Sequence, residues 1–494
     1  MKKRISIILA AAMLLALAVP FVSFAAVAES DVEAVLISKD GTEIDRGDFD
    51  WIISGVQDGD TVKMMSDVVT KTQIKIHASD VTIDGNGNTL YYAGTDYIFH
   101  FCAAEGYCDG TDNKYDDKEA GTIYLKNLTA KFVGESSGGI KTYHRTSIHC
   151  ENVNIYSSDL AHLSARNCKS DDIVYTYINC NFITTNQSIF SLRPDQTLNI
   201  YGGYFESYSG RALRVNDNMT ANVYGAIFAT RNTKADGTSA GTAAAKSTGT
   251  LNTAGCTFIN FAGEDTFVTE EGKGTINGDT GLWLNTAAGS SPIATLVDGV
   301  NLTVAGGTPA ATSRTEIKFG GSAANNGIRF QTVVDSAAIS RANGLKDEGT
   351  ALSYGTLIVP IASLAGNSIF SEGIVKLAEV DYVDIKAKDG IIEGANGDVT
   401  VNAALVDIKV KNVDTDFTAI GYVEYVVDGI TVREYGLYDA VKNTASMADL
   451  AVAALADVSA TETATHVYKT ADGKYSPYDE TQQAVLAIYA AYAK

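Results

Sequence analysis

The feature that most limits how this chain can fold is a four-residue pattern that recurs along its first half. The pattern is Asp, Asn or Gly, then a small or apolar residue, any residue, and an apolar or small residue. Its seven copies occupy residues 80–83, 127–130, 152–155, 179–182, 202–205, 225–228 and 255–258. From one copy to the next the steps are 47, 25, 27, 23, 23 and 30 residues. The first step is close to two shorter ones, and the last contains a polar insertion at 232–249. A fixed period in this range is the signature of a solenoid.

The first position of the pattern accepts the residue types that tolerate positive φ, so each copy marks a sharp corner between two strands. Segments 197–201 and 220–224 carry apolar residues at alternate places, as strands do. Each repeat is therefore predicted to contain a strand, a left-handed corner, a strand, a loop and a third strand. Stacked repeats would form parallel sheets around one core. We expect left-handed corners at Asn152, Asn179, Gly202, Gly225 and Gly255.

The corner residues also make the first half of the chain similar to a known family. The region from about 30 to 280 resembles the pectin-lyase-like right-handed parallel β-helix superfamily, which has an Asn at such a corner. Segments 59–63 (Gly-Asp-Thr-Val-Lys) and 81–87 (Val-Thr-Ile-Asp-Gly-Asn-Gly) are similar to the first coils of many secreted bacterial members. The superfamily holds lyases, hydrolases, tailspikes and adhesins, so the resemblance implies a fold rather than an activity.

The second half lacks the repeat. Gly, Thr, Pro and Ser from 306 to 313 indicate a linker, and strand-like runs follow at 327–334, 354–360, 401–410 and 419–425. Two helices are expected, one within 438–457 and one from Ser476-Pro477 through Lys494. Three of the runs are similar to a module found at the C-termini of secreted Firmicutes proteins, for which no settled activity is implied.

The predicted fold class is mainly β: a right-handed parallel β-helix followed by a separate β-rich module with C-terminal helices. The predicted boundaries are 1–28 for a signal peptide, 29–285 for the β-helix, 286–312 for a linker region and 313–494 for the C-terminal module.

The N-terminus predicts secretion. Lys2, Lys3 and Arg4 precede an apolar run, and Ala26-Val27-Ala28 forms an A-x-A cleavage site, which is the order of a signal peptide. Its removal would take the formal charge from −21 to −24, because three basic residues are lost. So acidic a chain should repel nucleic acid and anionic membranes. We expect a secreted protein, extracellular or associated with the cell surface, with no membrane span in the mature chain and no nucleic-acid partner.

Six cysteines remain in an environment that permits disulfides. Cys102 and Cys108 are close enough in sequence to close a small loop. Cys180 and Cys256 are interpreted as small buried core residues.

The carboxylates do not match a catalytic pattern, and the catalytic residues are left unknown. Asp171-Asp172 is an adjacent acidic pair, but it directly precedes a strand, as a solvated turn does, and no Asp–His cluster follows. No cofactor and no metal site are expected. The one alternative is Ca²⁺ held by the acidic loop 109–119, which lacks the spacing of a defined Ca²⁺ loop.

Basic residues, by contrast, gather in the middle coils of this acidic chain. We predict that a basic strip on stacked strands binds a ligand, and its candidate residues are His144, Arg145, His162, Arg193, Arg211 and Arg214. Leu213 and Val215 share one face of their strand, so Arg214 should point outward. Such a strip would pair carboxylates or sulfates of a glycan. The alternative is that carboxylates such as Asp172 and Glu206 neutralise these residues.

Six tyrosines share these coils and are either sugar-packing rings or ordinary sheet residues: Tyr143, Tyr175, Tyr177, Tyr201, Tyr204 and Tyr208.

Two functions from different classes remain open. The first is a non-catalytic extracellular protein that presents a β-helix surface for contact with an extracellular polysaccharide or cell-surface glycan. The alternative is a polysaccharide lyase or glycoside hydrolase that acts on acidic polysaccharide. Release of unsaturated or reducing ends would separate the two.

Overall fold

The computed structural model describes twenty-five segments of the chain, and all statements below concern these residues. They are 32–102, 121–134, 137–143, 145–165, 172–232, 240, 242–261, 267–269, 274–278, 282–285, 302–306, 327–334, 336–364, 371–377, 380–387, 391–406, 408, 410–412, 414–436, 438, 440, 443–446, 448, 467–469 and 475–477. The chain divides into one compact unit within Phe24–Asp298 and a second within Gly299–Lys494. Each unit is described separately.

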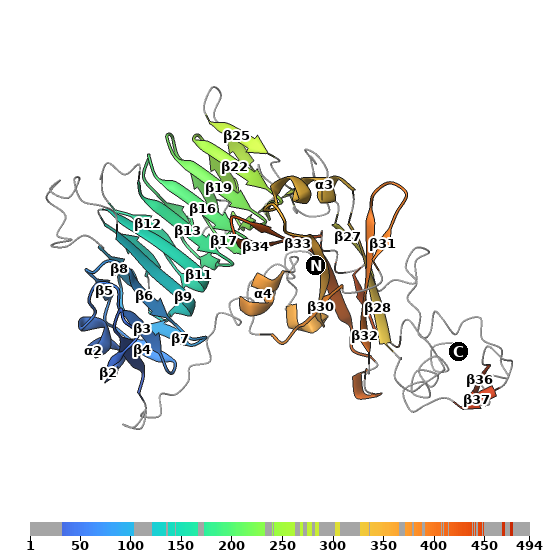
Figure 1. Cartoon of the computed structure of the whole chain (residues 1–494), viewed down its shortest axis with the longest axis horizontal. Coiled ribbons are helices and arrows are strands. Elements are labelled where there is room, and N and C mark those ends of the chain that lie inside the picture. Colours follow the sequence, from blue (N-terminus) through green and yellow to red (C-terminus); the bar gives the residue numbers. More distant parts are fainter. Residues whose placement is uncertain are drawn as a thin grey trace. The chain divides into compact units, whose positions relative to one another are not determined.

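The first unit is mainly β and is built from stacked parallel strands, three per coil (Figure 1). The first strands of successive coils are β3 (Thr61–Met64), β6 (Val81–Asp84), β9 (Gly121–Phe132), β11 (Thr146–Ser157), β13 (Val174–Ile178), β16 (Thr197–Tyr201), β19 (Thr220–Tyr224), β22 (Thr250–Ala254) and β25 (Thr275–Gly278). The second strands are β4 (Val68–Thr70), β7 (Thr89–Tyr92), the later parts of β9 and β11, β14 (Asn181–Thr184), β17 (Tyr204–Ser207), β20 (Ile227–Thr230), β23 (Thr257–Asn260) and β26 (Leu282–Asn285). Because β9 and β11 continue through the corner, these two series form one large sheet.

The third strands of the coils form two smaller parallel sheets. One contains β5 (Ile74–Ile76), β8 (Phe99–Phe101), β10 (Ile140–Thr142), β12 (His162–Ser164) and β15 (Phe190–Ser191). The other contains β18 (Leu213–Val215), β21 (Ala245–Ser247) and β24 (Phe267–Thr269). This arrangement is compatible with a β-helix-like fold.

The predicted corners are confirmed. The first residue of every copy of the pattern has positive φ, from +48° at Asn127 to +67° at Gly202. Two successive corner side chains are also hydrogen-bonded to each other. The Asn152 amide donates to Asn127 Oδ1 at 3.3 Å. From Asn127 onward the repeat marks the turn between the first and second strand of each coil, whereas Asp80 marks the corner between the third strand β5 and the first strand β6.

One continuous core runs through the coils. Phe205, Phe228 and Phe258 stack with ring centroids 5.2 and 5.4 Å apart. Cys180 and Cys256 are free thiols in this core, as predicted, and Cys150 is a third. Cys102 is disulfide-bonded.

An antiparallel cap adjoins the first coil. Strand β1 (Ala34–Ile37) pairs antiparallel with β2 (Glu43–Gly47) and with β3. Helix α2 (Phe49–Ser54) is N-capped by the Asp48 carboxylate, which accepts from Trp51 N. Its buried side chains, Phe49, Ile52 and Ile53, belong to the same core cluster as the coils.

The second unit is β-rich and contains three antiparallel sheets. The first has the order β27 (Leu302–Gly306), β28 (Gly327–Val334), β32 (Val399–Val406) and β31 (Ile392–Glu393). The second has the order β30 (Val383–Lys386), β29 (Ser353–Pro360), β33 (Phe417–Val427) and β34 (Ile430–Tyr435), with β35 (Thr444–Ala445) on β33. The third pairs β36 (Val467–Lys469) with β37 (Tyr475–Pro477).

Four predicted runs are strands of this unit, namely β28, β29, β32 and β33. The short helical segments are α3 (Ser336–Leu345), α4 (Glu372–Leu377) and the 3₁₀ turns Ile361–Leu364 and Val410–Asn412. Strand β27 lies within the range predicted as linker. Strand β35 occupies part of the range 438–457 in which the first terminal helix was predicted, and Ala448, the last residue of that range that the structure describes, is helical. Strand β37 stands where the second helix was predicted to begin, because this segment pairs with β36. Residues 478–494 and the predicted signal peptide lie outside the described residues.

Candidate functional site

The residues of the predicted basic strip do not all lie on the surface of the protein. His144 lies outside the described residues. Arg145 is largely buried and forms an ion pair with Asp172, whose carboxylate is 42% exposed. The carboxylate alternative therefore holds for Arg145, since Asp172 balances its charge.

His162 requires a correction, because its side chain points into the core and is fully buried. Its Nε2 lies 3.1 Å from Thr142 Oγ1, and its Nδ1 lies 2.5 Å from the Tyr177 hydroxyl. Burial lowers the pKa of His162 to about 3, so the ring is neutral at physiological pH. His162 contributes no charge to any surface strip.

Arg214 points outward from β18, as predicted, while Leu213 and Val215 are buried on either side of it. Arg193 and Arg211 are half-buried. Burial and the nearby charge of Arg214 lower the pKa of Arg211 below its ordinary value. Within the described part of the chain, no carboxylate pairs with Arg193, Arg211 or Arg214.

Further basic residues join Arg214 through the register of the third strands. The middle residue of each three-residue strand faces away from two buried neighbours. We call the basic residues at these positions the basic ladder, and they are Lys75, His100, Lys141, Arg214 and Lys246. His100 is the strand partner of both Lys75 and Lys141, and Arg214 is the partner of Lys246. Partners on neighbouring strands lie about 4.8 Å apart. No outward position on β5, β8, β10, β12, β15, β18 or β21 holds a carboxylate.

A pocket of about 480 Å³ opens at one end of the basic ladder, and its charged lining residues are Arg193, Arg214, Lys246 and Asp217. These four side chains carry a net formal charge of +2. Arg214 Nε donates to Asn216 Oδ1 at 2.8 Å, and Asn216 donates to the Leu192 carbonyl at 2.8 Å.

Arg193 is held in a similar way, because its Nε donates to the Ser164 carbonyl at 3.2 Å. In both arginines the bond from Nε fixes the guanidinium. Within the described residues, no bond engages the terminal nitrogens of either group. The pocket therefore presents two oriented guanidinium groups, which suits an anionic oxygen ligand.

Aromatic rings flank the other end of the basic ladder. Lys141 Nζ lies 5.4 Å from the Tyr97 ring centroid and 5.3 Å from that of Tyr143. The His100 ring stacks on Tyr143 with centroids 4.5 Å apart. Burial, with Lys141 and Lys75 nearby, lowers the pKa of His100 to about 4. His100 is thus a neutral stacking residue, and the charge of the basic ladder comes from its lysines and Arg214.

The other tyrosines of the middle coils are mostly core residues. Tyr175, Tyr177 and Tyr204 are fully buried, and Tyr201 is buried as well. Tyr175 belongs to an internal network, since its hydroxyl bonds to Ser164 Oγ and accepts from Gln196. The interpretation as ordinary sheet residues is confirmed for these four.

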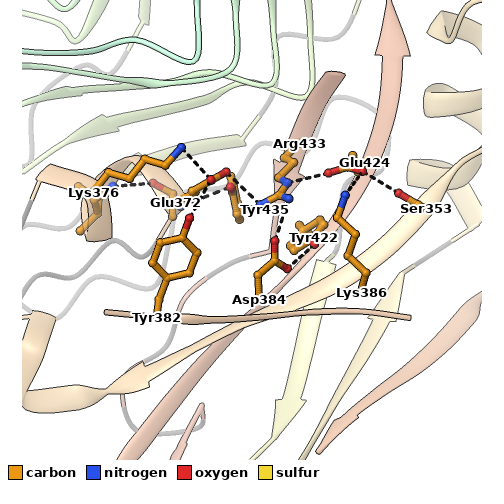
Figure 2. Close-up of polar contacts among 12 residues, drawn as sticks. Ser353, Glu372, Lys376, Tyr382, Asp384, Lys386, Tyr422, Glu424, Arg433 and Tyr435 are labelled. Atoms are coloured by element: carbon orange, nitrogen blue, oxygen red, sulfur yellow. Dashed lines mark hydrogen bonds and ion pairs between the residues drawn. The ribbon is translucent and has the colours of Figure 1, made fainter. Parts of the chain in front are cut away.

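A second polar cluster lies in the C-terminal unit and was not predicted (Figure 2). Arg433 on β34 forms ion pairs of 2.8–2.9 Å with Glu372 on α4, Asp384 on β30 and Glu424 on β33. Its guanidinium also lies 4.4 Å from the Tyr422 ring centroid. Burial alone would lower the pKa of Arg433, but the surrounding tyrosine and carboxylate groups raise it above its ordinary value.

This cluster binds elements of its own unit together. Lys376 pairs with Glu372, and Lys386 pairs with Glu424, so three basic groups face three carboxylates. The net charge of the cluster is zero, and each of the three guanidinium nitrogens of Arg433 donates to a carboxylate within the unit. We interpret it as a structural brace between α4, β30, β33 and β34.

Most of the carboxylates considered for catalysis and for Ca²⁺ binding lie outside the described residues. Asp171 and the acidic loop 109–119 lie outside the described residues, and Asp172 is paired with Arg145. In the described part of the chain, no group of three or more His, Cys, Asp and Glu residues is arranged to hold a metal ion. Among the same residues, no helix is long and apolar enough to cross a membrane.

No protein-family model, curated protein or solved structure matches this chain.

Proposed function

We propose that this chain is a secreted, non-catalytic protein whose first unit is a right-handed parallel β-helix that presents a surface for glycan contact. The observation that carries the proposal is the basic ladder with its pocket. In a chain of formal charge −21, four cationic side chains occupy outward positions of one sheet series without a carboxylate among them. Anionic polymers are repelled elsewhere and attracted here.

The ligand that fits this surface is an extended acidic polysaccharide of an extracellular matrix or cell surface. Carboxylates or sulfates would pair with Arg193 and Arg214, while sugar rings would pack near the partly exposed Tyr143. The proposed location outside the cell rests on the signal-peptide pattern, and the pectin-lyase-like relationship rests on the corner residues. The similarity of the second unit to C-terminal modules of secreted Firmicutes proteins belongs to the same proposal.

The test is retention on polygalacturonate, alginate and a glycosaminoglycan at low and high salt. The double variant Arg214→Ala with Lys246→Ala should lose at least about tenfold in affinity, which corresponds to about 1.4 kcal/mol. The control is Arg46→Ala, which removes an exposed arginine of β2 that pairs with Glu43. Binding should weaken as salt rises.

Three results would contradict the proposal. They are the absence of binding by the parent protein, equal binding by the double variant and the parent, and release of unsaturated or reducing ends from the polysaccharide. The last result would favour the lyase or hydrolase alternative.

A further inference from the structure

A second outward face of the first unit has the opposite character from the basic ladder. Strands β13, β16, β19, β22 and β25 contain no charged residue among their 24 positions. At the chain's overall content of 20% charged residues, about five would be expected. Earlier strands of the same sheet carry Asp84, Lys126 and Glu151 at outward, mutually paired positions. The loss of charge therefore begins at β13.

The outward residues of this face form two straight rows. Thr197, Thr220, Thr250 and Thr275 are partners in successive strands. Asn199, Asn222, Asn252 and Asn277 are partners in the same strands. All eight are at least partly exposed. We call these two rows the Thr/Asn face.

The asparagines of the Thr/Asn face are held in place by one another. Asn222 donates to Asn199 at 2.8 Å, Asn252 donates to Asn222 at 2.7 Å, and Asn277 donates to Asn252 at 2.8 Å. Each bond uses one of the two amide hydrogens of its donor and one of the two oxygen lone pairs of its acceptor. Asn222 and Asn252 therefore keep a second donor and a second acceptor in a fixed orientation. Little further ordering is needed when a ligand binds.

The spacing of these groups is regular in two directions. Neighbouring rungs are about 4.8 Å apart, and the Thr and Asn rows are separated by two residues, or roughly 6.6 Å. Tyr201 and Tyr224, with ring centroids 5.8 Å apart, stand at the ends of two of the same strands. The result is a rigid, uncharged array of hydroxyl and amide groups beside aromatic rings.

We propose that the Thr/Asn face binds a neutral, extended polysaccharide, such as a β-linked glucan or chitin fibre. Charge complementarity selects this ligand, because an uncharged face offers nothing to pair an ionised sugar, and burying a carboxylate there would be costly. A hydroxyl-rich neutral chain can satisfy the remaining amide and hydroxyl groups and pack on the partly exposed ring of Tyr224. The ligand and the face both differ from those of the basic ladder, so the two sites are independent.

The experiment is a sedimentation assay with microcrystalline cellulose and with chitin, using the full-length protein at low and high salt. The parent should adsorb to at least one of them with an affinity that salt does not reduce. The double variant Thr220→Lys with Thr250→Lys should bind at least about tenfold more weakly. The control, Thr82→Lys with Thr122→Lys, places the same charges on half-exposed positions of β6 and β9 and should bind like the parent.

A second variant guards against misfolding. Thr220→Val with Thr250→Val keeps the side-chain shape and removes two hydroxyls, and should weaken adsorption about threefold. The inference is overturned if the parent adsorbs to neither polymer, or if both threonine variants bind like the parent. It is also overturned if adsorption disappears at high salt and in the Arg214/Lys246 variant, because the basic ladder is then the contact. Association of the parent into dimers that the lysine variant abolishes would assign the face to a second copy instead.

Discussion

Replacement of Gly225 with Val tests the corner geometry on which the coils depend. Gly225 has φ of +62°, and the equivalent residues Asn152 and Asn179 have φ of +54° and +50°. A β-branched residue held in this region costs about 1–3 kcal/mol. For a unit of this size, each kcal/mol lowers the melting temperature by about 2–4 °C, so Gly225→Val should melt about 2–12 °C below the parent.

The matched control is Gly225→Asn, because Asn is the residue that other coils use at the same corner. Its cost should be much smaller than that of Val, since Asn tolerates left-handed backbone. Thermal melts followed by circular dichroism compare the three proteins, and hydrogen exchange of β19 and β20 shows whether the loss is local. A Val variant that melts with the parent, or an Asn variant as unstable as Val, would refute the assigned register.

Two further predictions concern charge inside the molecule. Arg433→Gln should lower the free energy of unfolding of the C-terminal unit by about 2–4 kcal/mol, because three carboxylates lose the guanidinium and only Glu372 and Glu424 keep a lysine among the described residues. The more exposed Lys386→Gln should cost less than about 1 kcal/mol. Equal effects of the two variants in urea denaturation would contradict the brace. Because the pKa of His162 is lowered in the folded state, the unfolded chain binds a proton at this residue more readily than the folded chain does. The free energy of unfolding therefore carries no penalty from His162 above about pH 6.5. It falls by about 1.4 kcal/mol per pH unit as the pH drops from 6.5 toward 3. His162→Gln should make stability less steeply pH-dependent between pH 7 and pH 4, and an unchanged dependence would show that His162 is not buried in its neutral form.

The corners were predictable because their cause is local. Positive φ is tolerated by Asn, Asp and Gly wherever they stand, so the residue type alone marks the turn. The direction of Arg214 was predictable for a similar reason, since Leu213 and Val215 alternate with it on one strand.

The remaining parts of the candidate site depend on register between coils, which the sequence does not show directly. The direction of the side chains on β12 is the reverse of what residue polarity predicts, because His162 faces the core and Leu163 faces outward. The His162 ring is accommodated there by the Tyr177 and Thr142 hydroxyls, which come from other strands. Lys246 was missed because residues of the polar insertion separate it in sequence from its strand partner Arg214.

The brace around Arg433 could not be predicted from the sequence because its residues lie far apart along the chain. Its partners Glu372 and Asp384 lie 61 and 49 residues away in sequence. No spacing rule links residues across such intervals, and each is an ordinary charged residue in its own segment. Only the pairing of β30, β29, β33 and β34 brings them together.

The antiparallel cap also constrains how proteins of this kind can change in length during evolution. Strand β3 has β1 beside it on one edge and β6 on the other, so no new parallel coil can be added between β3 and the cap without unpairing β1. Growth is easier in the interior, where 23-residue steps join successive corners and the rows continue unbroken. Duplication of residues 202–224 would add one complete coil, with its own glycine corner, threonine, asparagine and core phenylalanine in register. Lineages of this fold should therefore differ by whole internal coils while keeping the same capped beginning.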